Sequence, residues 1–207
     1  GEILGHKNRD AYFQSGDSVF SVNIDSHKIK LLYVFPDNFH GHIATVNVNE
    51  TLLAGVWSSD EARKILQKYP QKSGFFNRIY DAHIPHVLFT INLKTKELVK
   101  IDSESTWLNH EQFSPVDPDL LLYGHEGPWD KVDRTWVINV KTKEKKLLHK
   151  RTMKGEINGH EWWAPDGKRV WFDLQIPRSV TFHVAGVDIK TGEEKRYQLQ
   201  RNEWSIH

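Results

Sequence analysis

A β-hairpin with a histidine at its start recurs along this sequence at intervals of about 50 residues. The clearest copy spans 158–175: a short aromatic strand that opens near His160, a turn at 164–167 and a second strand at 169–173. A second copy carries His110, which precedes His160 by 50 residues. Self-similarity at this period indicates a repeat architecture and constrains the fold more than any single motif does.

Two weaker copies and a recurring turn extend the series. A further copy begins at the end of the chain and carries His207, 47 residues after His160, and a looser one covers 41–54 with one extra residue before its turn. The turn after each hairpin repeats as well, with an Asn or Asp between two apolar residues at Asn92, Asn139 and Asp188, which are 47 and 49 residues apart. The unit of structure is therefore 45 to 50 residues long.

One interval in the series is longer than the others, which locates an insertion. From Asn23 to Asn92 the same turn recurs only after 69 residues. Within this stretch, Ser58-Ser59-Asp60-Glu61 has the pattern of a capping box, a helical run follows, and Pro70 ends it. We therefore expect one helical insertion, near 58–69.

About four short strands fit into each unit, which predicts an all-β chain folded as a β-propeller of four-stranded antiparallel blades. A parallel sheet would need a crossover helix in every repeat, and the pattern predicts only one helix. The expected units are a partial blade at 1–35, whose first strand is weak or missing, blades at about 41–102, 108–150 and 156–200, and the start of a next blade at 204–207. Because propellers close with about four to eight blades, we expect further blades on both sides.

The amino-acid composition excludes several kinds of binding partner. Twenty-eight basic and 27 acidic side chains nearly cancel, so the charge pattern predicts no nucleic-acid partner. No apolar run approaches the length of a membrane span and no signal peptide opens the chain, so we expect no membrane partner. There is no cysteine, and any metal would have to bind imidazole, carboxylate or amide groups.

Histidines at equivalent places in successive units are the first candidate site. The first strand of each propeller blade lines the central axis, so His110, His160 and His207 are expected to converge there although they are far apart in sequence. Three imidazoles on one axis could bind a divalent metal or act as acid and base near neutral pH. The alternative is that each histidine only hydrogen-bonds a neighbouring blade.

Residues at the ends of the second strands form another candidate set. They comprise His125, Glu126, Trp129 and Arg134 after one hairpin, and Gln175 and Arg178 after the next. Such loops gather at one mouth of a propeller, and arginine commonly grips anionic substrates there. Arg134 could equally pair with a nearby carboxylate for a structural purpose.

Three segments together resemble one enzyme family. They are Trp107-Leu108-Asn109-His110, His125-Glu126-Gly127-Pro128-Trp129 with Val132-Asp133-Arg134, and Gly159-His160-Glu161-Trp162-Trp163 with Pro165-Asp166-Gly167. From about residue 78 to 207 the chain resembles the oligogalacturonate lyases, polysaccharide lyases that degrade short pectin fragments on a seven-bladed propeller. The hairpins alone would also fit a TolB-like propeller.

The resemblance implies a reaction and roles for residues. The family cleaves by β-elimination: a base removes the C5 proton next to the uronate carboxylate, and the O4 glycosidic bond breaks. By this likeness the substrate is an acidic oligosaccharide, His110 is the catalytic base, and His160 binds a manganese ion whose site is completed by blades absent from this chain. We add Arg134 to the catalytic residues as a source of positive charge, and His207 to the metal ligands because of its position in the repeat. His125, Glu126, Trp129, Gln175 and Arg178 would bind substrate. The resemblance also favours the cytoplasm, with the periplasm left open.

One position departs from the family pattern. Val87 stands where the better-known lyases have a catalytic arginine. Arg78 or Arg134 could supply the charge, or the substrate could be another uronide. Two other classes of function remain open from the sequence: a non-catalytic propeller that binds protein or sugar, and a hydrolase or epimerase on the same scaffold.

Overall fold

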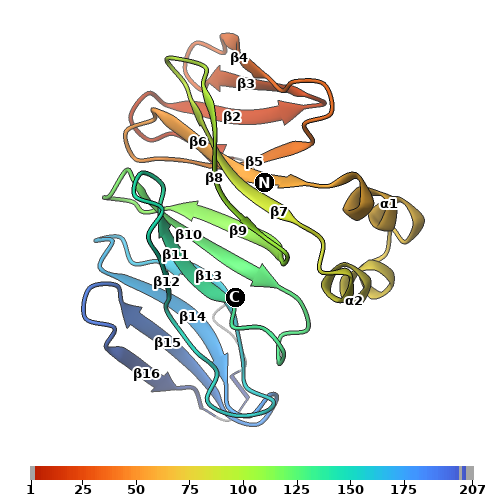
Figure 1. The fold of residues 1–207 in the computed structure, drawn as a ribbon. Helices are drawn as coiled ribbons and strands as arrows, with labels where there is room; N and C mark the ends of the chain where they lie inside the picture. Colours follow the sequence, from red (N-terminus) through yellow and green to blue (C-terminus); the bar gives the residue numbers. More distant parts are fainter. Residues whose placement is uncertain (1–2, 201, 204–207) are drawn as a thin grey trace.

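Four antiparallel sheets of four strands each form the chain in the computed structural model, which describes residues 3–200, 202 and 203. Within each sheet the strands lie in chain order, and the four sheets follow one another along the sequence (Figure 1). The predicted four-stranded antiparallel blade is therefore confirmed. The expected start of a further blade at 204–207 lies outside the described residues.

The strands of each blade have the following bounds. The first blade contains β1 (Ile3–Leu4), β2 (Asp10–Ser15), β3 (Ser18–Asn23) and β4 (Ile29–Val34). The second contains β5 (Gly41–Val46), β6 (Leu52–Ser58), β7 (His86–Asn92) and β8 (Leu98–Glu104). The third contains β9 (Trp107–Phe113), β10 (Leu120–Glu126), β11 (Thr135–Asn139) and β12 (Lys145–Leu147). The fourth contains β13 (Ile157–Trp163), β14 (Arg169–Gln175), β15 (Phe182–Asp188) and β16 (Glu194–Gln198).

The recurring Asn or Asp makes the turn between the third and fourth strands of each blade. Asn139 Oδ1 accepts the backbone N–H groups of Lys141 and Thr142 at 3.0 and 2.9 Å. Asp188 Oδ1 likewise accepts the backbone N–H groups of the residues two and three positions later, at 3.0 and 2.9 Å. These side chains replace the backbone as turn acceptors, which is why the sequence period is carried by Asn and Asp.

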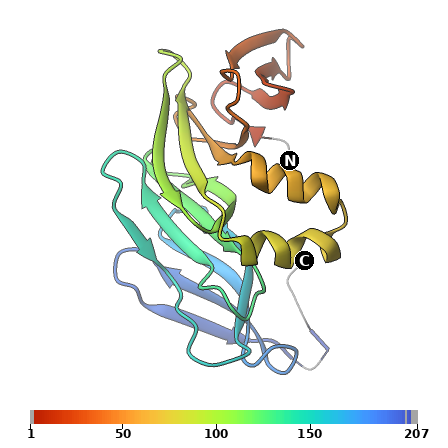
Figure 2. The same cartoon turned by 45° about the vertical axis from the view of Figure 1, so that its right-hand side comes forward.

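Two helices fill the insertion between β6 and β7, so the prediction of one helix was wrong. The expected helix is α1 (Asp60–Lys68), capped by Ser59, whose Oγ accepts the N–H of Ala62. The second is α2 (Lys72–Ala82), which has no side-chain N-cap and includes Gly74. Local sequence favours α2 only weakly, and its packing against the third blade compensates for this. Figure 2 shows both helices projecting from one side of the sheets.

Apolar residues from neighbouring blades share each core. Leu88 of β7 packs in one cluster with Leu121 and Ile138 of the third blade. Leu122 of β10 packs in another with Phe172 of β14. Because each blade buries one face against the next, the position of any side chain near the axis depends on two blades at once. Within the described residues, no helix is long and apolar enough to cross a membrane.

Candidate functional site

His110 and His160 each occupy a β-bulge in the first strand of a blade. Asn109 pairs with Gly124 and Gln112 with Leu122, so His110 and its successor together oppose one residue of β10. The same shift occurs around His160 in β13. Both histidines have left-handed backbone angles, with φ of 62° and 54°. A bulge turns the side chain away from the regular alternation of the strand, and bulges of this kind are common next to active sites.

Both imidazoles open into one cavity of about 280 Å³, although they come from different blades. Their side chains are 44% and 57% exposed. Six other residues that matter for the chemistry line the same cavity: Lys72, Glu126, Trp129, Arg134, Asp173 and Gln175. For His110 and His160, the structure therefore gives the convergence that the repeat pattern predicts.

Glu126 holds the imidazole of His110. The Nε2 of His110 lies 2.7 Å from Oε1 of Glu126, which is 5% exposed. Burial by itself would raise the pKa of Glu126, but hydrogen bonds from His110 and Arg134 lower this pKa to about 2. A carboxylate only accepts hydrogen bonds, so Nε2 of His110 carries a proton and the neutral ring keeps its lone pair on Nδ1.

Arg134 is held between two carboxylates from different blades. Its Nη2 lies 2.8 Å from Oε1 of Glu126, and its Nε lies 2.5 Å from Oε1 of Glu161. Burial alone would lower the pKa of Arg134, but Glu161 and Glu126 raise it, so the guanidinium stays charged. The positive charge of Arg134 is thus already compensated inside the protein. Of its nitrogens, only Nη1 lacks an acceptor in the part of the chain that the structure describes.

The other predicted substrate-binding residues divide into two groups. Trp129 and Gln175 line the cavity with the histidines, and Arg178 lines two adjoining cavities that also include Trp129. His125 turns away: its ring stacks on Trp136 at 4.9 Å between centroids, and its Nε2 lies 3.1 Å from Glu104. His125 is therefore part of the blade interior and does not line this cavity.

Glu111 is a buried carboxyl beside the site that the sequence did not reveal, and comparison of equivalent positions in neighbouring blades explains its surroundings. Glu111 and Glu161 each follow the bulge histidine of their blade. Arg134 pairs with Glu161 of the following blade and lies five residues before the turn residue Asn139. The equivalent position in the preceding blade, five residues before the turn residue Asn92, is Val87. Glu111 is 6% exposed, its Oε1 has no hydrogen-bond partner among the described residues, and burial raises its pKa to about 7. Val87 therefore explains why this buried carboxyl has no cation beside it.

The family match covers nearly the whole chain. The sequence matches the family described as oligogalacturonate lyase over residues 2–205. The chain belongs to the oligogalacturonate lyase family. Among curated relatives, the oligogalacturonide lyase of Pectobacterium atrosepticum is 28% identical over 190 residues, which are 91% of this chain and 48% of that protein. The oligogalacturonate lyase of Dickeya dadantii is also 28% identical, over 89% of this chain and 47% of that protein.

Solved structures agree with the family assignment. A structure described as oligogalacturonate lyase in complex with manganese matches 95% of this chain and 52% of that chain, with a TM-score of 0.82 and 26% identity. TolB from Acinetobacter baumannii matches with a TM-score of 0.62 at 12% identity, which is a likeness of fold alone. This oligogalacturonate lyase family member spans about half the length of the curated relatives it matches.

One of the similar structures is a manganese complex, and His160 is the candidate ligand for such an ion among the described residues of this chain. His160 Nδ1 lies 2.6 Å from Oδ2 of Asp173, and a carboxylate on one imidazole nitrogen typically orients the other nitrogen toward a metal. No group of three His, Cys, Asp or Glu side chains that could hold a metal ion exists within residues 3–200, 202 and 203. The predicted ligand His207 lies outside those residues. The described blades thus fit a metal site in part.

Proposed function

We propose that the complete protein is a lyase that cleaves short uronate oligosaccharides of the oligogalacturonate type by β-elimination. One observation carries the proposal: His110 and His160, from two blades, share one cavity, and a carboxylate holds each ring. This arrangement supports the proposal, because the two imidazoles could serve as a proton acceptor and a metal ligand for one sugar unit in the same cavity.

His110 would act as the base. Glu126 fixes the ring through Nε2, so Nδ1 is the atom that takes the C5 proton of the sugar. The C5–H electrons form the C4–C5 double bond, and the C4–O4 bond breaks with its electron pair on O4. The released oxygen takes up a proton from water, and His110 later returns its proton to solvent. Arg134 would act as a positioning residue, because its contacts with Glu126 and Glu161 set the angle at which the His110 ring faces the cavity.

His160 would contribute one ligand to a divalent metal, manganese in our proposal, and residues outside the described part of the chain would supply the others. The bound cation would neutralise the uronate carboxylate, which makes the C5 proton more acidic. Trp129 and Gln175 line the same cavity and would contact the sugar, with Arg178 close by.

The test uses the complete protein with oligogalacturonate and manganese. Formation of the 4,5-unsaturated product is followed by its ultraviolet absorbance, with and without a chelator. We expect product only when metal is present. If no uronide yields an unsaturated product from folded, metal-loaded protein, the lyase proposal is wrong.

A further inference from the structure

Of the basic residues that line the cavity, one is not held in an ion pair with another described residue. Two permanently charged basic residues line the cavity, Lys72 and Arg134. Arg134 is neutralised by Glu126 and Glu161, as described above. Lys72 forms no ion pair within the part of the chain that the structure describes, and it is exposed. Lys72 also lines the adjoining 420 Å³ cavity, so it stands at the border between the two as a basic residue that an anionic ligand could still pair with.

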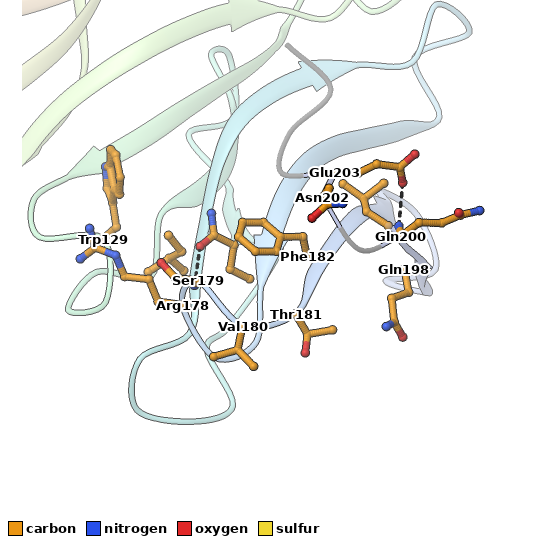
Figure 3. Close-up of a pocket in the computed structure, with 13 residues that line it drawn as sticks. Trp129, Arg178, Ser179, Val180, Thr181, Phe182, Gln198, Gln200, Asn202 and Glu203 are labelled. Carbon is orange, nitrogen blue, oxygen red and sulfur yellow. Dashed lines mark hydrogen bonds between the residues drawn. The ribbon is translucent and has the colours of Figure 1, made fainter.

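Trp129 brings a second cation, which also lacks an ion pair among the described residues, close to the first. The Nζ of Lys72 lies 5.7 Å from the centroid of the Trp129 ring, and the Cζ of Arg178 lies 5.7 Å from the same centroid. The Nζ of Lys72 and the Cζ of Arg178 are therefore separated by at most twice 5.7 Å. Arg178 also has no ion-pair partner among the described residues, and Figure 3 shows its guanidinium beneath Trp129. Contact with an aromatic ring holds a cation while leaving its N–H groups available.

The same three residues join the cavities. Trp129 lines the 280 Å³ cavity with the histidines and two adjoining cavities of about 420 and 570 Å³. Lys72 and Arg178 both line the 420 Å³ cavity, while only Lys72 reaches the histidines. A chain of sugars that enters the histidine cavity would therefore continue past Trp129 between these two cations.

Close packing holds the helix that carries Lys72 against the third blade. Phe75 and Phe76 of α2 lie against Trp107, with centroids 6.0 and 5.5 Å apart. A Cβ on Gly127, in the loop that carries Trp129, would lie only 2.4 Å from Cδ2 of Tyr80 in α2. The loop and the helix fit together only because Gly127 has no side chain. The packing thus fixes the start of the inserted helix beside the loop of Trp129, and the Nζ of Lys72 lies 5.3 Å from the ring centroid of Phe76 and 5.7 Å from that of Trp129.

We propose that Lys72, Trp129 and Arg178 form a binding subsite for a uronate unit beyond the pair of sugars at the scissile bond. Lys72 and Arg178 bind carboxylates of the oligosaccharide, and Trp129 sets the spacing between them. This inference rests on the proposed lyase function for the reaction it serves. The helical insertion, through Lys72, would then select acidic substrates of three or more units.

The experiment uses the complete protein with digalacturonate and trigalacturonate. Lys72→Met keeps the length of the side chain and removes its charge, and we expect KM for trigalacturonate to rise about tenfold while KM for digalacturonate and both kcat values change less than about threefold. Arg178→Gln should act in the same direction, and Lys72→Arg should restore most of the loss. Lys68→Met is the matched control, because Lys68 also contacts an aromatic ring, Tyr69, but lines none of the three cavities.

Two results separate this inference from the proposed function. If the wild-type protein cleaves trigalacturonate and Lys72→Met has the same KM as the Lys68→Met control, the subsite is wrong and the lyase stands. If the wild-type protein cleaves nothing, calorimetric binding of trigalacturonate decides: weaker binding by about tenfold in Lys72→Met supports the subsite, and equal binding rejects it.

Discussion

His110 Nε2 lies 2.7 Å from Oε1 of Glu126, and the same carboxylate oxygen accepts a hydrogen bond from Arg134 at 2.8 Å. One oxygen atom therefore couples the imidazole that opens into the cavity to a buried guanidinium. Arg134 in turn reaches Glu161 in the next blade. The orientation of His110 depends on this chain of contacts. The packing of the third blade against the fourth therefore sets the geometry of the proposed base.

Replacement of His110 tests the base directly. We expect His110→Asn in the complete protein to lower kcat about 10²- to 10⁴-fold, because the proton acceptor is gone. Asparagine is chosen because it tolerates the left-handed backbone that His110 adopts at φ 62°. His27→Asn is the control, since exposed His27 has nearly the same φ, 56°. Full turnover in a folded His110→Asn protein would mean that another group removes the proton.

The contact between His160 and Asp173 should govern metal affinity. We expect Asp173→Asn to weaken manganese binding by the complete protein about 10- to 100-fold, because the imidazole loses the group that orients it. Calorimetric metal titration measures this without relying on activity. Asp60→Asn is a suitable control, because Asp60 contacts His40 at 3.1 Å on the surface, where its side chain is 71% exposed. Unchanged metal affinity in Asp173→Asn would remove His160 from the metal site.

Glu111 and Glu161 should respond in opposite ways to the same substitution. Burial raises the pKa of Glu111 in the folded protein to about 7, whereas its ordinary pKa is near 4.5. Glu111 therefore does not lower the free energy of unfolding below about pH 4.5, and lowers it increasingly as pH rises to 7. We expect Glu111→Gln to raise the free energy of unfolding at pH 8 by roughly 1–3 kcal/mol and to leave it unchanged near pH 4.5. Glu161→Gln should lower it, since Arg134 loses a partner. Urea unfolding at the two pH values distinguishes these outcomes, and equal effects of both substitutions would contradict the repeat argument.

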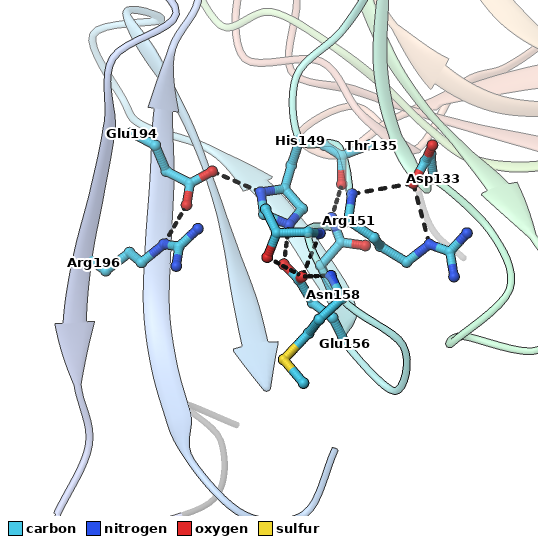
Figure 4. Close-up of polar contacts among 10 residues, drawn as sticks. Asp133, Thr135, His149, Arg151, Glu156, Asn158, Glu194 and Arg196 are labelled. Atoms are coloured by element: carbon cyan, nitrogen blue, oxygen red, sulfur yellow. Dashed lines mark hydrogen bonds and ion pairs between the residues drawn. The ribbon is translucent and has the colours of Figure 1, made fainter. Parts of the chain in front are cut away.

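A buried histidine away from the cavity should set the pH dependence of stability. His149 Nδ1 lies 2.6 Å from Glu194 and its Nε2 lies 2.8 Å from Glu156 (Figure 4). Burial alone would lower the pKa of His149, but the two carboxylates raise it. The stabilisation is therefore complete below about pH 6.5, the ordinary pKa of histidine, and is lost as pH rises through the raised folded pKa.

The two carboxylates of this cluster act in the other direction. The pKa values of Glu156 and Glu194 are lowered, so their stabilisation is present above the ordinary pKa of a glutamate and is lost as pH falls. We expect His149→Gln to cost about 3 kcal/mol of unfolding free energy at pH 6 and to flatten its decline from pH 6 to 9. His27→Gln, on an exposed turn, should change neither quantity. An unaltered pH profile in His149→Gln would show that the cluster does not titrate in this range.

Some features of this protein were determined by the sequence by itself. The four-stranded unit and its turns are local, because alternating side chains and an acceptor such as Asn139 or Asp188 act over a few residues. The spacing of His110 and His160 placed them at equivalent points of successive units. The helix α1 was visible through the serine and acidic residues before it, although its cap is Ser59 and not the predicted Ser58. Each of these signals lies within one stretch of chain and needs no partner from elsewhere.

The tertiary structure alone decided the rest, because it depends on contacts between distant segments. The bulges that aim both histidines arise from pairing with the second strand, and Arg134 meets Glu161 only where two blades pack. The helix α2 has a weak local signal and is held by Trp107, which lies 31 residues after Phe76 of that helix. Lys72 therefore reaches Trp129 through packing, which no pattern in either segment reveals.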